Sequence, residues 1–126
     1  MVAALLDTSI IVDFLRLHQP AAEWIADQEE AYGVTLYVWL EVIQGCQNKV
    51  KQKQAAKLLN SFELIQVTAD DVAWAVTALT NHNLQFGVDI LDCLIASTSS
   101  RTQLPLYTQN IKHFKPLLGE LAQSPY

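Results

Sequence analysis

The first ten residues, MVAALLDTSI (residues 1–10), carry the pattern on which the fold depends. Residues 3–6 form a continuous apolar run, which is typical of a short strand inside a parallel sheet with both faces covered. Asp7 ends that run, and residues 8–17 fit a helix. A strand followed at once by a helix places Asp7 at the carboxyl end of the strand. In parallel α/β sheets this is the edge where ligands bind.

The composition is that of a folded domain. The chain has 126 residues, of which 51% are hydrophobic and 17% are charged, and we expect residues 1–126 to form a single domain with its own core. The formal net charge of −5 argues against a protein that coats nucleic acid. It does not exclude an enzyme that holds metal ions between its own carboxylates and a phosphate.

The cysteines and the N-terminal segment indicate the cellular compartment in which the protein is expected. Cys46 and Cys93 stand outside any CxxC motif, so the sequence predicts a protein of the reducing cytoplasm rather than a disulfide scaffold. The apolar N-terminal run has no basic region before it, and Asp7 and Asp13 interrupt it. We therefore expect neither a signal peptide nor a membrane span.

Strands and helices are expected to alternate along the rest of the chain, with a turn at Gly33. This alternation predicts βαβ units and an α/β fold with a parallel sheet. The tail after Phe114 shows no clear pattern. The predicted strands are 34–37, 62–67 and 104–107, and the predicted helices are 21–30, 38–46, 49–60, 89–101 and one that is capped at Thr68 and runs through His82.

Three further acidic residues lie in apolar surroundings, as Asp7 does. Glu41 lies in YVWLEVIQG, and Asp89 and Asp92 lie in DILDCLIAS, three residues apart and so on one helical face. A carboxylate on a buried helix face is unfavourable unless it is paired or binds a metal. Asp and Glu side chains that converge in space are the ligands that Mg²⁺ and Mn²⁺ prefer.

Each of these residues also has an ordinary structural explanation. Asp7 fits an N-cap as well as it fits a site residue, and for Asp89 the N-cap is the preferred interpretation. Asp92 fits the third position of a helix, where the helix dipole favours an acid. Glu41 is hardest to explain in this way, because its neighbours are apolar. Asp13 is expected to face solvent or to pair with Arg16.

Four segments, taken together and in order, resemble a PIN domain, and specifically a VapC-type toxin ribonuclease of a type II toxin–antitoxin system. The resemblance covers nearly the whole chain and implies a PIN-like three-layer α/β/α fold with a short central parallel sheet. The segments are LLDTSIIVDFLR with Asp7, LEVIQG with Glu41, LDCLIAST with Asp92, and LYTQNIKHF.

The resemblance implies a role for each of these positions. Asp7, Glu41 and Asp92 are the implied catalytic residues and would hold one or two Mg²⁺ or Mn²⁺ ions for hydrolysis of RNA. Ser9, Asp89, Thr108 and Asn110 would support them, as groups around metal ligands do. The resemblance also implies a homodimer and a small antitoxin protein that offers an arginine to the carboxylates.

The fourth segment departs from the family pattern, in which many relatives carry an aspartate. Here the candidates are Asn110, which is uncharged, and His113, for which the ordinary expectation is a surface residue. The missing charge leaves the number of metal ions open. It also slightly favours an alternative, a catalytically inactive PIN-like module that binds RNA or protein.

The sequence leaves several other points open. Arg16 and Lys112, near the ends of two motifs, are weak candidates for RNA contacts, whereas the lysines of 49–57 fit an ordinary solvated helix face. A receiver or a phosphatase of the haloacid dehalogenase type is a further alternative. Such a phosphatase usually needs a second aspartate two residues after the first, where this chain has Ser9.

Overall fold

The computed structural model describes residues 1–126, which form five strands, seven α-helices and one 3-10 helix. The strands are β1 (Val2–Leu6), β2 (Ala31–Thr35), β3 (Glu63–Ile65), β4 (Leu106–Tyr107) and β5 (Ala122–Gln123). The helices are α1 (Thr8–Leu15), α2 (Gln19–Ala26), α3 (Leu36–Gly45), α4 (Lys49–Leu59), α5 (Ala69–Phe86), α6 (Ile90–Thr102), α7 (Ile111–Leu118) and the 3-10 helix η1 (Gly119–Leu121). No helix has both the length and the hydropathy needed to cross a bilayer.

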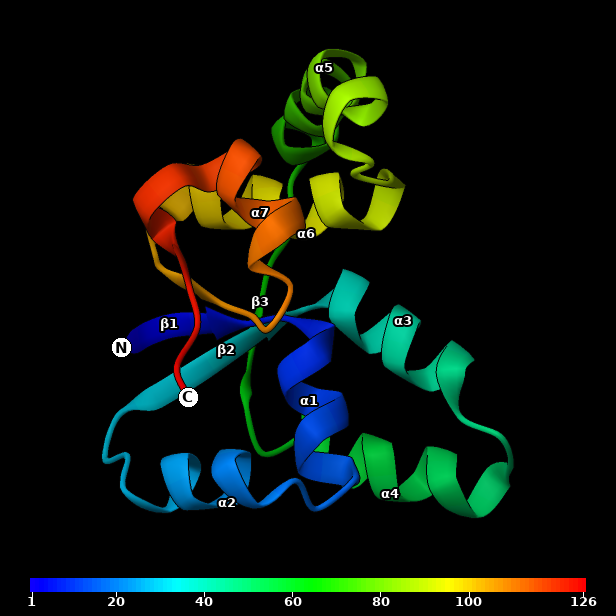
Figure 1. Ribbon diagram of the computed structural model, residues 1–126. Coiled ribbons are helices and arrows are strands. Elements are labelled where there is room, and N and C mark those ends of the chain that lie inside the picture. The colour runs from blue at the N-terminus through cyan, green and yellow to red at the C-terminus, as the bar shows by residue number, and fades with distance from the viewer.

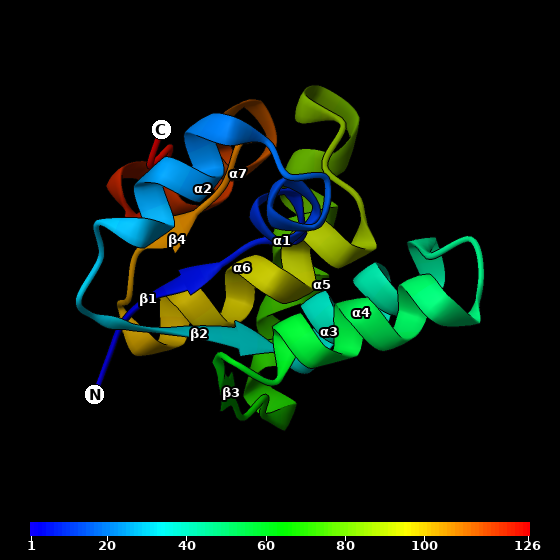
Figure 2. The ribbon, with the colours of Figure 1, turned by 90° about the horizontal axis from the view of Figure 1, so that it is seen from below.

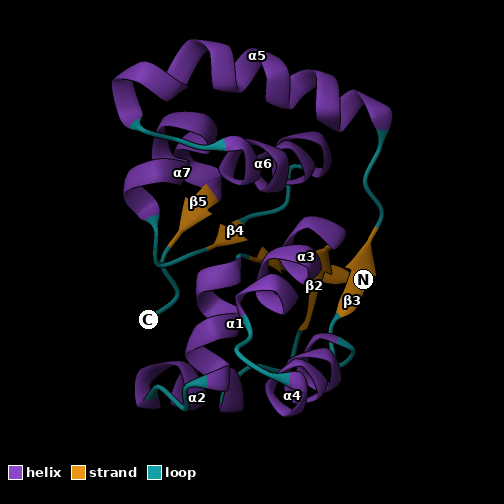
Figure 3. Cartoon of the chain, turned by 90° about the vertical axis from the view of Figure 1, so that its right-hand side faces the viewer, coloured by secondary structure: helices purple, strands orange, loops and turns teal.

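All five strands are parallel, in the order β3-β2-β1-β4-β5. Helices α5, α6 and α7 lie on one side of the sheet, and α1, α2 and α4 lie on the other (Figures 1 and 3). Seen from below, α1 is viewed almost along its axis, between α2 and α4 (Figure 2). The predicted α/β/α fold with a short parallel sheet is confirmed.

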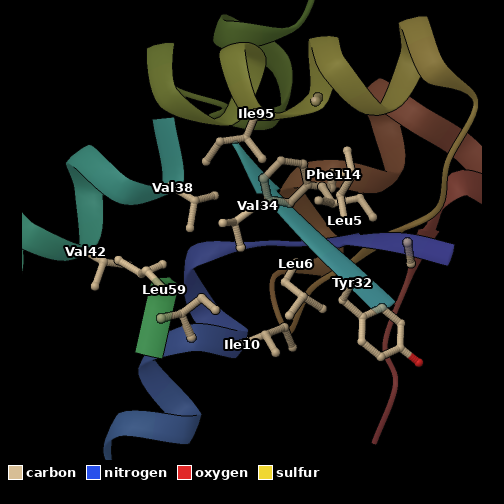
Figure 4. Packing of buried hydrophobic residues seen from close by; sticks show 14 of the residues in the cluster. Leu5, Leu6, Ile10, Tyr32, Val34, Val38, Val42, Leu59, Ile95 and Phe114 are labelled. Atoms are coloured by element: carbon tan, nitrogen blue, oxygen red, sulfur yellow. The ribbon is translucent and has the colours of Figure 1, made fainter. Parts of the chain in front are cut away.

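The core forms where the central strand meets helices from both layers. Leu5 and Leu6 of β1 are buried together with Ile10 of α1, Ile95 of α6 and Phe114 of α7 (Figure 4). Burying one such side chain stabilises the fold by about 1.5–3 kcal/mol. Because β1 is covered on both faces, its sequence is continuously apolar and does not alternate.

Gly33 was expected in a turn and lies instead inside β2, paired with Leu5 on one side and with Glu63 on the other. A Cβ atom at this position would lie 2.6 Å from Cγ1 of Ile65 and 3.2 Å from Cγ1 of Val2. The glycine is therefore explained by the close approach of side chains across the sheet. As a result β2 begins at Ala31, three residues earlier than predicted.

Several other boundaries differ from the predicted ones for local reasons. Helix α2 ends at Ala26 rather than at residue 30, because the acidic residues that follow are unfavourable at the negative end of a helix dipole. Helix α5 continues to Phe86 and ends at Gly87, which has a φ of 71°. The tail without a clear pattern forms α7, η1 and the edge strand β5.

The predicted cap at Thr68 is confirmed and belongs to a larger polar cluster. Thr68 and Asp71 form a reciprocal capping box at the start of α5. Asp71 is only 1% exposed and also accepts a hydrogen bond from Nε of Arg101 at 2.8 Å. Burial alone would raise the pKa of Asp71, but the hydrogen bonds from Arg101 and Thr68 outweigh it, and the net pKa lies below the ordinary value.

We expect Arg101→Leu to lower the free energy of unfolding at pH 7 by about 2 kcal/mol. Loss of a fully buried pair costs more, but the Arg101 side chain is 37% exposed and partly screened by water. Because the pKa of Asp71 is lowered in the fold, its contribution is present at neutral pH and is lost as the pH falls through that pKa. The difference from the wild type, measured by urea denaturation, should therefore shrink in acid.

Lys115→Gln is the matched control. Lys115 pairs with Glu120 at 3.9 Å, and the Glu120 side chain is almost completely exposed. Loss of this pair should leave the urea midpoint unchanged. Equal effects of the two substitutions would contradict the structural role given to Arg101.

Candidate active site

The site lies where the direction of chain winding reverses in the sheet. The chain passes from β1 outward to β3, then returns to place β4 on the other side of β1. In open α/β sheets a ligand crevice forms at such a switch point, beyond the carboxyl ends of the strands. Asp7 directly follows β1 and Thr108 directly follows β4, and the N–H of Asp7 donates to the carbonyl of Tyr107 at 3.0 Å. Helices α1, α3 and α6 all begin at this end of the sheet (Figure 1).

Asp7 occupies the N-cap position of α1, but its side chain makes no capping hydrogen bond. Its Oδ2 atom instead accepts hydrogen bonds from Oγ1 of Thr108 at 2.7 Å and from Oγ of Ser9 at 3.0 Å. Asp7 is 4% exposed and Thr108 is completely buried. The capping explanation for Asp7 is therefore wrong, since its carboxylate makes no capping hydrogen bond and is held by two hydroxyl groups.

The same hydroxyl groups also fix the loop after β4. Oγ of Ser9 accepts from the N–H of Gln109 at 3.0 Å, and Oγ1 of Thr108 accepts from the N–H of Asn110 at 2.8 Å. Each hydroxyl thus accepts from the loop backbone while it donates to Asp7. This network joins segments about 100 residues apart in the sequence and orients the Asp7 carboxylate.

Asp89 and Asp92 form a capping box at the start of α6. Oδ1 of Asp89 accepts from the N–H of Asp92 at 2.8 Å, and Oδ2 of Asp92 accepts from the N–H of Asp89 at 3.0 Å. The N-cap interpretation of Asp89 and the first-turn interpretation of Asp92 are both confirmed. Asp92 nevertheless faces the same cavity as Asp7, whereas Asp89 lines a different one.

His113, for which the expectation from sequence was a surface position, reaches this site. Its Nδ1 atom lies 3.2 Å from Oδ2 of Asp92 and 3.0 Å from Nδ2 of Asn110. The first turn of α7 therefore brings His113 to the aspartate of the third segment, and Asn110, the N-cap of α7, contacts His113. The only sequence signal for this contact was the spacing of Asn110 and His113, which places them one helical turn apart.

Glu41 comes from the second turn of α3, which Thr35 caps by accepting from the N–H of Val38. Together with Asp7 and Asp92 it lines a cavity of about 330 Å³ whose walls hold no hydrophobic residue and no lysine or arginine. The remaining walls are Thr8, Ser9, Gln109 and Asn110. The structure therefore brings together the three carboxylates that the sequence singled out from three separate segments.

The electrostatics of the cavity are those of crowded, poorly solvated acids. Burial raises the pKa of Asp7, against the hydrogen bonds from Thr108 and Ser9. Burial also raises the pKa of Glu41 against the interaction with the Thr8 hydroxyl, and the charges of Asp7, Asp89 and Asp92 add to that rise. Burial raises the pKa of Asp92 too, although the hydrogen bond from the backbone of Asp89 and the interaction with His113 oppose that rise. No lysine or arginine lines the cavity to compensate the three carboxylates, and His113 contacts Asp92 alone among them.

The donor set fits a hard divalent cation. Carboxylate oxygens of Asp7, Glu41 and Asp92 face one polar cavity, and the buried hydroxyl of Thr8 on its wall makes no close hydrogen bond beyond its approach to Glu41. No three acidic, histidine or cysteine side chains stand close enough to form a ready-made cage. The residues suit an ion that keeps some of its water molecules, as Mg²⁺ does in proteins.

The other predicted residues lie outside this cavity. Arg16 is exposed at the end of α1 and lines a neighbouring cavity, and Lys112 is exposed on α7. The expectation that Asp13 faces solvent or pairs with Arg16 is wrong, because Asp13 accepts a hydrogen bond from the hydroxyl of Tyr126 at 2.6 Å. The C-terminal tyrosine was not a predicted partner, since nothing local to either residue indicates the contact.

A family model describing the PIN domain matches residues 4–115, and the chain therefore belongs to the PIN domain family. The resemblance seen in the four segments is confirmed at this level, and the receiver and phosphatase alternatives are excluded. A search of curated proteins gave no match.

Solved structures of toxin–antitoxin systems share the fold. One is a toxin–antitoxin complex from Klebsiella pneumoniae, 23% identical, with 98% of each chain covered and a TM-score of 0.80. Another is VapBC2 from Rickettsia felis bound to a promoter DNA fragment, 22% identical, with 91% of this chain and 92% of that chain covered and a TM-score of 0.71. VapBC-1 from nontypeable Haemophilus influenzae is 20% identical, with 93% and 92% covered and a TM-score of 0.71.

The raised pKa of Asp7 leads to a prediction about stability. A carboxyl whose pKa is raised in the fold stabilises the protein below its ordinary pKa of 3.8, and that contribution is lost as the pH rises through the folded pKa. Asp7→Asn keeps an oxygen that accepts from Thr108 and Ser9 but carries no charge. We expect it to be more stable than the wild type at pH 7, by about 1 kcal/mol, and this advantage should shrink toward pH 4.

The measurement is thermal unfolding from pH 4 to pH 7, with and without MgCl₂ or MnCl₂. Divalent cations should raise the Tm of the wild type and have little effect on Asp7→Asn. Asp27→Asn, an exposed position at the end of α2, is the control and should respond as the wild type does. A Tm of the wild type that does not respond to either cation would contradict the cation site.

Proposed function

We propose that this PIN domain is a VapC-type toxin, an endoribonuclease that hydrolyses RNA phosphodiester bonds with the help of Mg²⁺ or Mn²⁺. The observation that carries the proposal is the convergence of Asp7, Glu41 and Asp92 on one cavity without a basic residue. PIN domains of VapC toxins are nucleases, and the fold is shared with toxin–antitoxin structures. We also propose that residues 1–126 form one domain.

Asp7, Glu41 and Asp92 would hold the metal, which would lower the pKa of a bound water and neutralise charge on the phosphate. The protein residues around them keep the carboxylates in place. Thr108 and Ser9 fix the rotamer of Asp7 through Oδ2, which leaves Oδ1 without a hydroxyl donor and free to face the cavity. Such supporting contacts set how precisely a ligand is placed.

Asp92 is held from two sides in the same way. The backbone of Asp89 donates to its Oδ2 atom, and His113 approaches that oxygen from α7 while also contacting Asn110. Asn110 stands where many relatives have an acid and adds no charge to the cavity. A site with three carboxylates therefore suits one firmly held ion better than two.

The proposed partners follow from the same site and from the surface. An antitoxin arginine would place a positive charge among carboxylates that no lysine or arginine of this chain faces, and RNA would be the substrate. Several large apolar side chains are exposed on α3, on α5 and at the start of α6, and exposed side chains of this kind suit the homodimer that the resemblance implies. They are Leu36, Leu40, Val72, Val76, Leu84 and Ile90. Two free cysteines fit a place in the reducing cytoplasm.

The first test is cleavage of single-stranded RNA by the purified chain in MnCl₂, MgCl₂ or EDTA. Cleavage should require a divalent cation, and Asp7→Asn should lower the rate at least about 100-fold, because a ligand charge is lost at the reacting centre. Asp27→Asn should cut like the wild type. A folded wild-type chain that binds RNA but cleaves none in any metal would favour the alternative, a catalytically inactive PIN-like module, which the missing fourth acid supports.

The second test concerns the toxin role and the antitoxin. Expression of the wild-type chain in a bacterial host should arrest growth, and Asp7→Asn should not. Co-expression of the product of an adjacent small gene should relieve the arrest. Arrest that persists in Asp7→Asn at equal protein levels would show that the cavity is not the source of toxicity.

A further inference from the structure

A second cavity, of about 280 Å³, adjoins the carboxylate cavity between α1, α3 and α4. The two cavities share one residue, Glu41, which lines both. The walls differ in character, because side chains of Val12, Leu15 and Val42 give the second cavity an apolar floor. Its volume lies just below the range of about 300–1,000 Å³ that is usual for pockets that bind drug-sized ligands, and so suits a smaller group.

The rim of this cavity is positively charged. Arg16 comes from the end of α1 and Lys51 from the first turn of α4, and both line the cavity. Neither side chain forms a salt bridge or a hydrogen bond within the protein. Two unpaired cations therefore stand beside a cavity whose only charged wall groups are carboxylates, in a chain whose net charge is −5.

The remaining polar groups are two amides. Gln47 follows α3 and Gln54 lies on α4, and both line the cavity and are exposed. An amide offers donors and an acceptor together, which matches the edge of a nucleobase. Single-stranded RNA is recognised by unstacked bases that pack on apolar or guanidinium surfaces while side chains hydrogen-bond to their edges.

We propose that this cavity is a nucleobase subsite, which takes the base of one RNA nucleotide next to the phosphate that is cleaved. The apolar floor and the Arg16 guanidinium would cover the ring, and the two cations would meet the adjoining phosphates. The position follows from Glu41, because a chain whose phosphate lies at the carboxylates passes directly into the second cavity. This inference rests on the proposed function and adds a source of sequence preference to it.

Charge favours RNA over a protein side chain as the occupant. A partner protein would need acidic side chains beside an apolar one, because an apolar side chain alone would fill the floor but leave Arg16 and Lys51 without counter-charges. A nucleotide offers a flat apolar ring, polar edges and anionic phosphates, and so satisfies all three kinds of wall group at once.

Gly45 provides a way to close the cavity without disturbing the fold. It is the last residue of α3 and lines the cavity, and a Cβ atom built on it would meet no atom within 4 Å. Its φ is negative, so a side chain is compatible with the backbone. Gly45→Leu should therefore fold normally and place its side chain in the cavity, whereas Gln44→Leu, on the adjacent exposed position outside the cavity, is the matched control.

The experiment compares wild type, Gly45→Leu and Gln44→Leu on a pool of RNA oligonucleotides with random sequence, and the cleaved ends are sequenced. We expect the wild type and Gln44→Leu to share a base preference at one position beside the cleaved bond. Gly45→Leu should lower that preference about tenfold or more while cleavage continues, because a pocket contact of this kind discriminates by about that factor. Cleavage with an unchanged preference in Gly45→Leu overturns the subsite and leaves the proposed nuclease intact.

A binding measurement keeps the inference testable if the chain cuts no RNA. Each of the four nucleoside 5′-monophosphates, with inorganic phosphate as the reference, is titrated into ¹⁵N-labelled protein without divalent metal. At least one nucleotide should shift the amide signals of residues 45–47 more than phosphate does, and Gly45→Leu should abolish the difference. Equal shifts with phosphate, or none, overturn the subsite. Loss of antitoxin rescue in Gly45→Leu with an unchanged base preference would instead assign the cavity to a protein side chain.

Discussion

The hydrogen bond from Thr108 to Asp7, 2.7 Å long and fully buried, is the contact on which the site depends. It joins the residue after β1 to the residue after β4, on the two strands that flank the switch point of the sheet. Because both strands are parallel and paired, their carboxyl ends are fixed side by side, and a hydroxyl group on one meets a carboxylate on the other. The bond places an acid at the edge of the sheet and prevents it from capping the helix that follows.

That arrangement gathers negative charge where water is scarce. A carboxylate that capped a helix would be neutralised in part by the helix dipole and by backbone N–H groups. Asp92 has such a cap, yet its pKa is still raised, and the pKa of Asp7 is raised although the hydroxyl groups of Thr108 and Ser9 and nearby backbone N–H groups oppose the rise. The resulting repulsion is unfavourable in the protein alone, and a cation bound among the carboxylates would relieve it. Binding of the ligand would then stabilise the folded state.

The sequence predicted those parts of the site that carry a local signal. Asp7 follows an apolar run, Glu41 interrupts one, and Asp89 and Asp92 have the three-residue spacing of a capping box. It did not predict the approach of His113 to Asp92 or of Tyr126 to Asp13, because those contacts depend on how helices pack across the sheet. Gly33 was wrongly placed in a turn for the same reason. A side chain at this position is excluded by Val2 on β1 and Ile65 on β3, and the sequence does not show these neighbours.

The two adjoining cavities suggest how an acidic chain can take a polyanion as substrate. A uniformly basic surface would attract RNA anywhere along its length and with little selectivity. Under the proposed function, the acidic cavity would repel a phosphate until a cation is bound, and Arg16 and Lys51 stand beside it on the rim of the second cavity. Attraction of the phosphate that is cleaved would then depend on the metal. Glu41, on the wall between the two cavities, would then couple the binding of a base to the placement of the neighbouring phosphate.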